Sequence, residues 1–140
     1  MKRILVFLAV IALCGCRDTK IGYLITDNAE YIPKTMEIPK EIDRTDPKNK
    51  TRVDNNAPWV TYPMQGVLGT QPINYAIADV EATDGGNAQK FREELVMRGG
   101  GMMEVPLDPA SPVGTYVVSV RVYNEDHSQI LTGAFTFTIK

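Results

Sequence analysis

The alternation of apolar and polar residues is clearest near the C-terminal end of the chain. From Thr115 to Tyr123 every second residue is apolar and shares one face of an extended strand, namely Tyr116, Val118, Val120 and Val122. A turn-rich stretch follows at 124–128, and a second alternating run leads from Ile130 to Ile139. Alternation with a period of two is typical of a strand with one buried face. The two runs therefore predict a terminal antiparallel hairpin.

Shorter strand-like runs punctuate the rest of the chain with glycine and proline between them, at 23–26, 31–38, 59–64, 73–80 and 102–105. Residues 88–97 fit two patterns, because Ala88, Phe91 and Leu95 share a helical face, yet Phe91, Glu93 and Leu95 also alternate. The glycines at 99–101 and the strand-like 102–105 favour a hairpin, so we predict a strand at 88–97. Seven or eight short strands without a long helix predict an all-β chain folded as a single antiparallel β-sandwich.

The N-terminal residues have the pattern of an export signal. Lys2 and Arg3 precede an unbroken apolar run at 4–13, which is shorter than the roughly twenty residues needed to span a bilayer. The ending Leu13-Cys14-Gly15-Cys16 resembles the lipobox of bacterial lipoproteins, which implies cleavage before Cys16 and a lipid on that cysteine. An ordinary secretion signal, or a buried element of a cytosolic fold, is the alternative. We expect a signal peptide at 1–15, a lipidated cysteine and tether at 16–20, and one sandwich domain at 21–140.

Segment 40–56 interrupts the strand rhythm, because Ile42 and Val53 are its only apolar side chains apart from a single proline. It predicts a long polar loop. Structureless loops of this length are uncommon in compact domains and are usually functional or disordered.

Composition and charge exclude several function classes. With 15 basic against 17 acidic residues, the chain has no electrostatic footprint for nucleic acid. His127 is the only histidine and falls in the predicted hairpin turn, where we expect a solvated residue. No second histidine or unmodified cysteine is available to complete a zinc site or a thiol dyad. We therefore expect no enzymatic activity, no cofactor and no metal site.

A resemblance adds a cellular setting. The string Pro112-Val113-Gly114-Thr115-Tyr116, the strand after it and the closing 135–139 look like the C-terminal half of small immunoglobulin-like lipoprotein domains from the glycan-utilisation loci of anaerobic gut bacteria. The resemblance implies an immunoglobulin-like sandwich, anchored by lipid at the outer membrane and facing either the cell surface or the periplasm. It carries over no binding residue.

Aromatic residues are the remaining candidates for contact with a ligand. Sugars stack their C–H faces on flat rings, so Trp59 and Tyr62, with Arg52 from the polar segment, form the predicted ligand-binding set if Trp59 is exposed. A single tryptophan in a β-sandwich more often packs in the core. We predict a non-catalytic envelope lipoprotein that binds polysaccharide or serves as an accessory in a surface complex. A structural or assembly lipoprotein that contacts only other envelope proteins is the alternative.

Overall fold

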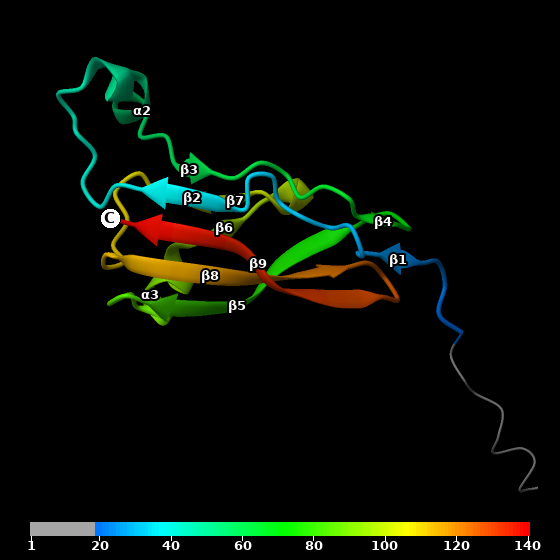
Figure 1. The fold of residues 1–140 in the computed structure, drawn as a ribbon. Helices are drawn as coiled ribbons and strands as arrows, with labels where there is room; N and C mark the ends of the chain where they lie inside the picture. Colours follow the sequence, from blue (N-terminus) through cyan, green and yellow to red (C-terminus); the bar gives the residue numbers. More distant parts are fainter. Residues whose placement is uncertain (1–18) are drawn as a thin grey trace, which may run out of the picture.

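The predicted C-terminal hairpin is present in the computed structural model, which describes residues 19–140 (Figure 1). Its strands are β8 (Gly114–Tyr123) and β9 (Ser128–Ile139), paired antiparallel. Burial alternates along β8 as the sequence pattern predicts, with four side chains fully buried, Tyr116, Val118, Val120 and Val122. The signal peptide predicted at 1–15 and the lipidated Cys16 lie outside the described residues.

The strands of residues 19–140 form three sheets. The largest has the order β2-β9-β8-β5, where β2 is Thr35–Ile38 and β5 is Asn74–Thr83. A second has the order β3-β7-β6, built from Trp59–Val60, Met103–Val105 and Val96–Met97. The third pairs β1 (Leu24–Ile25) with β4 (Leu68–Gly69) at one end of the molecule (Figure 1). The all-β sandwich is therefore confirmed.

One strand pair departs from the antiparallel prediction. Strand β2 runs parallel to β9, with Ile38 opposite Ile139. Parallel neighbours require a crossover connection, and here the whole chain between them supplies it. The pairing continues past the strand ends, because the Lys40 amide donates to the Lys140 carbonyl and the Lys140 amide donates to the Ile38 carbonyl.

The prediction of a strand at 88–97 is wrong for its first part, which forms helix α3 (Ala88–Glu94). Asn87 caps this helix, because its side-chain oxygen accepts a hydrogen bond from the Lys90 amide at 3.0 Å. Phe91 is fully buried, and its place on the inner helical face decides between the two patterns that the sequence allowed. The chain becomes extended again at β6.

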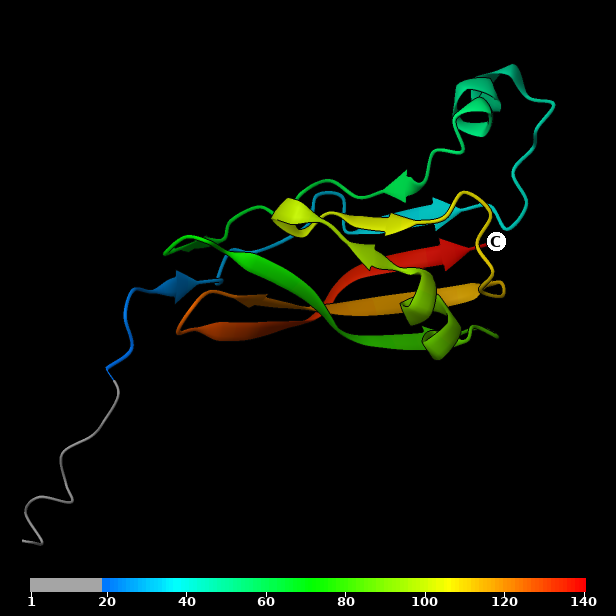
Figure 2. The ribbon, with the colours of Figure 1, turned by 180° about the vertical axis from the view of Figure 1, so that it is seen from behind.

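Segment 40–56 is not a structureless loop. It contains a short 3-10 turn, Pro47–Asn49, and helix α2 (Lys50–Asp54), which project from the end of the sandwich (Figures 1 and 2). The Lys40 ammonium group donates to the carbonyls of Pro109 and Ser111, and Arg44 pairs with Asp108 at 2.7 Å. These contacts fix the root of the projection to the loop before β8.

Among residues 19–140, no helix combines the length and the apolar character that crossing a bilayer would require.

Candidate functional site

The turn between β8 and β9 lies at the end of the sandwich that also carries β1 and β4 (Figure 1). Asn124 fixes this turn. Its side-chain amide donates to the carbonyls of Tyr23 at 2.8 Å and Thr70 at 3.2 Å, while its side-chain oxygen accepts from the His127 amide at 3.0 Å. A backbone bond from the Asn124 amide to the His127 carbonyl closes the turn. One buried asparagine thus holds the turn against the residues that flank β1 and β4, Tyr23 before β1 and Thr70 after β4.

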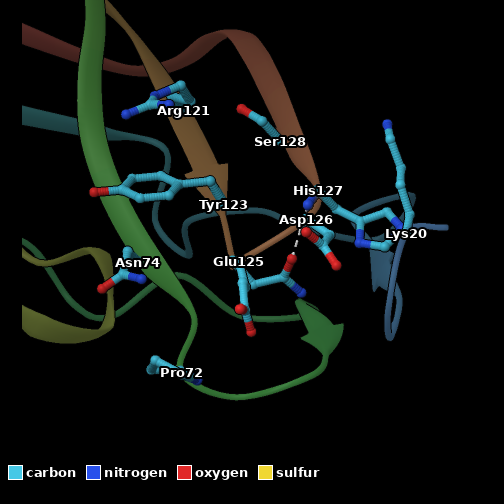
Figure 3. Close-up of a pocket in the computed structure, with 10 residues that line it drawn as sticks. Lys20, Pro72, Asn74, Arg121, Tyr123, Glu125, Asp126, His127 and Ser128 are labelled. Atoms are coloured by element: carbon cyan, nitrogen blue, oxygen red, sulfur yellow. Dashed lines mark hydrogen bonds between the residues drawn. The ribbon is translucent and has the colours of Figure 1, made fainter. Parts of the chain in front are cut away.

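An open pocket of about 810 Å³ is formed beside this turn (Figure 3). Backbone from three parts of the chain meets there: the first described residues, the start of β5 and the β8–β9 hairpin. The lining is mostly polar and charged, and it consists of Lys20, Pro72, Asn74, Arg121, Tyr123, Asn124, Glu125, Asp126, His127 and Ser128.

His127 is the notable side chain of the pocket. The expectation of a solvated turn residue needs correction, because the imidazole is only partly exposed and its Nδ1 is buried without a hydrogen-bond partner. A buried polar atom without a partner is costly, and native structures contain few of them. The turn therefore leaves this imidazole without the hydrogen bond that would commit it to a structural role.

Acidic and basic groups share the pocket. The Asp126 carboxylate accepts a hydrogen bond from the Ile21 amide through Oδ2 at 2.6 Å, which ties the start of the described chain to the turn. On the opposite wall the Arg121 guanidinium lies over the Tyr123 ring, 4.0 Å from its centroid. The lining of the pocket thus contains donors suited to a cation, the His127 imidazole and the carboxylates of Glu125 and Asp126, together with the positive charge of Arg121.

The predicted ligand-binding set lies elsewhere. Trp59 is partly buried on β3, and its indole N–H donates to the Leu107 carbonyl at 3.2 Å. The Arg52 guanidinium lies 4.1 Å from the centre of the Trp59 ring and also donates to the Pro58 carbonyl. Tyr62 is 68% exposed. The structure thus brings Arg52 and Trp59 together, but Arg52 covers a ring face that a stacking ligand would need.

Other possible metal donors are scattered. Among residues 19–140, no three His, Cys, Asp or Glu side chains are grouped so that they could hold a metal ion together. Thioethers are soft ligands that suit copper(I), but Met64 and Met103 are buried in the apolar core, and Met97 lies opposite Met103 in the β6–β7 pair. These methionines pack as core residues. The β8–β9 pocket is therefore the place in the described chain where an imidazole and carboxylates are accessible together.

Comparison with known proteins gives one match. The model of the CopC domain matches residues 42–140. No curated protein and no solved structure matches the chain. The CopC family consists of copper-binding periplasmic β-sandwich proteins. This finding overturns the predicted glycan-binding or surface-accessory function, and it overturns polysaccharide or other envelope proteins as the predicted partners. A sequence signal for the site was present in the lone His127 between Asp126 and Ser128, but a single histidine did not predict a metal.

Proposed function

This chain belongs to the CopC domain family, whose model covers 42–140, and on that basis we propose that it binds copper ions in the periplasm. The periplasmic setting agrees with the envelope location expected from the sequence. The proposal replaces the sequence-based expectation that the chain has no metal site. It concerns binding and not catalysis, in keeping with a family that is typically non-enzymatic.

One observation supports a particular site for the copper. The Nδ1 of His127 is buried without a hydrogen-bond partner in the wall of the pocket that Asp126 and Glu125 also line. Imidazole nitrogen and carboxylate oxygen are ligands that copper(II) accepts readily, and copper(II) stands highest in the usual order of divalent affinities. The side chain that the fold leaves unsatisfied is thus the one best suited to copper.

The pocket favours copper(II) over copper(I). Copper(I) selects thioether and thiolate sulfur, whereas Met64 and Met103 are packed away from solvent in the core. The pocket offers nitrogen and oxygen donors only.

The small number of donor groups also limits how strongly the pocket binds copper. His127 is the chain's only histidine, and no three possible donor side chains among residues 19–140 are grouped around one point, so one imidazole and at most one carboxylate hold the ion and water completes its coordination. Lys20 and Arg121 line the same pocket and repel a cation. We therefore propose an exchangeable copper cargo and not a permanently held ion.

Copper(II) titration tests the proposal. In wild-type protein, electron paramagnetic resonance should show one nitrogen-coordinated copper(II) species, which His127→Ala should lose. Gln129→Ala is the matched control, because Gln129 is exposed on β9 just after the turn and does not line the pocket. If His127→Ala binds copper(II) like the wild type, the assignment to this pocket fails. Retention of binding by His127→Ala together with its loss in Met64→Leu would place the copper among the core methionines instead.

We also propose that lipid on Cys16 attaches the protein to the outer membrane, at its periplasmic face. The lipobox-like ending at 13–16 supports the attachment, and the periplasmic setting of the family supports the face.

A further inference from the structure

A group of exposed apolar side chains lies at the end of the sandwich where the described chain begins. Ile21 is 72% exposed, Tyr23 53%, Ile25 43% and Leu68 59%. Ile25 and Leu68 are direct partners in the antiparallel β1–β4 pair, so their side chains share one face. We call these four residues the end face. A cluster of exposed apolar side chains on a small protein calls for a partner more than single exposed ones do.

The backbone beneath the end face is well tied. Leu24, between Tyr23 and Ile25, packs against the hydrophobic core. The Tyr23 amide donates to the Thr70 hydroxyl at 3.1 Å, and the Thr70 amide donates back to the Tyr23 carbonyl. Strand pairing therefore sets the direction of Ile25 and Leu68, and hydrogen bonds from their backbone amides hold Tyr23 and Ile21 next to them, so this segment is not a fraying end.

The position of the end face in the chain indicates what covers it. Only four residues separate Cys16 from Ile21, and a fully extended chain advances about 3.3–3.6 Å per residue, so a lipid-bearing Cys16 holds Ile21 within roughly 17 Å of the bilayer. Helix α2 projects from the opposite end of the sandwich (Figure 1). Of the two ends, the one that an N-terminal lipid brings to the membrane is thus the one that carries the end face.

We propose that the end face rests on the lipid bilayer, with Ile21, Ile25 and Leu68 at the boundary between headgroups and acyl chains. This inference depends on the lipid attachment proposed above. Tyr23 suits such a position, because its ring is apolar while its hydroxyl remains among the headgroups. Lys20, next to Ile21, meets anionic headgroups at the same level. The domain is then held in one orientation by its own side chains, and the lipid serves to bring it there.

Fluorescence quenching tests the orientation in the full-length lipoprotein, reconstituted into vesicles that contain brominated phospholipid. In the wild type all tryptophan fluorescence comes from Trp59, the only tryptophan in the chain. Strand β3, which carries Trp59, lies toward α2 and away from β1 (Figures 1 and 2). We expect brominated lipid to leave Trp59 emission unchanged and to remove most of the emission added by Tyr23→Trp. Within the Tyr23→Trp protein, Ile25→Ser with Leu68→Ser should restore that emission, whereas Val60→Ser with Val113→Ser, two exposed positions outside the end face, should not.

The outcomes separate this inference from the one on which it rests. If the protein sediments with the vesicles but the emission of Trp at position 23 is not quenched, the lipid attachment stands and the proposed orientation is wrong. Protein that stays in the supernatant overturns both. If a second copy covers the end face instead, position 23 remains unquenched and crosslinking yields a dimer that Ile25→Ser with Leu68→Ser abolishes, which also overturns the proposal.

Discussion

The ring of Phe91 on helix α3 stacks on the ring of Tyr116 on strand β8, with centroids 4.3 Å apart and planes inclined by 17°. Both side chains are fully buried. The Tyr116 hydroxyl also accepts a hydrogen bond from the Asn87 amide and donates to the Pro112 carbonyl. This pair joins α3, the longer of the two α-helices among residues 19–140, to the largest sheet.

Phe91→Ala is therefore expected to lower the free energy of unfolding by about 3–5 kcal/mol, the usual cost of removing a buried phenylalanine ring. Chemical denaturation of the two proteins measures the difference. Lys90→Ala, at the exposed neighbour on the same helix, should change stability by no more than about 0.5 kcal/mol. Similar losses for both variants would mean that the stacked pair contributes little.

Tyr31 makes the free energy of unfolding depend on pH in the alkaline range. Its hydroxyl donates to the Gly101 carbonyl at 2.6 Å, and burial raises the pKa of Tyr31 well above its usual value of about 10. The folded state thus holds a proton that the unfolded chain releases above about pH 10, so stability falls as pH rises past that value. Wild-type protein should lose stability more steeply than Tyr31→Phe in unfolding experiments between about pH 9 and pH 11.

At neutral pH the same substitution is expected to destabilise by about 1–3 kcal/mol, because the Gly101 carbonyl loses its buried partner. If the free energy of unfolding falls equally steeply with pH in both proteins above pH 10, the loss of stability comes from other groups. Tyr75 is one of them, because burial also raises its pKa.

Processing at the lipobox-like sequence should depend on Cys16. Cys16→Ala is expected to abolish incorporation of labelled fatty acid, whereas Cys14→Ala should leave it intact, because small Gly15 precedes Cys16 while bulky Leu13 precedes Cys14. Metabolic labelling followed by electrophoresis measures both. Equal labelling of the two variants would refute lipidation at Cys16.

The sequence predicted the elements whose pattern is local. Alternation from Thr115 to Tyr123 specifies a half-buried strand by itself, and β8 follows it residue by residue. Helix α3 was missed because Phe91 and Leu95 are four residues apart, a spacing that suits both a helical turn and every second position of a strand. The tertiary contact with Tyr116 decides between them, and such a contact lies outside any local pattern. The parallel pairing of β2 with β9 joins residues about a hundred positions apart and leaves no local sign.

The candidate site was harder to predict for the same reason. Composition showed one histidine, which by itself predicts no metal site. Its partial burial depends on Asn124, whose side chain joins the turn to Tyr23 and Thr70, far away in the sequence. Trp59 is partly buried and packs against the core, and the Arg52 guanidinium over its ring depends on helix α2, in a segment expected to be a loop.

The hydrogen bond from the Ile21 amide to Asp126 also has a mechanical meaning. Tension applied through the residues before 19 reaches this bond and the short β1–β4 pair before it reaches the long strands of the core. Two-residue strands yield at lower load than the long ladder between β8 and β9. A pulling force on the N-terminal segment would therefore break the hydrogen bond to Asp126 and destabilise the turn that carries His127, while the rest of the sandwich stays folded.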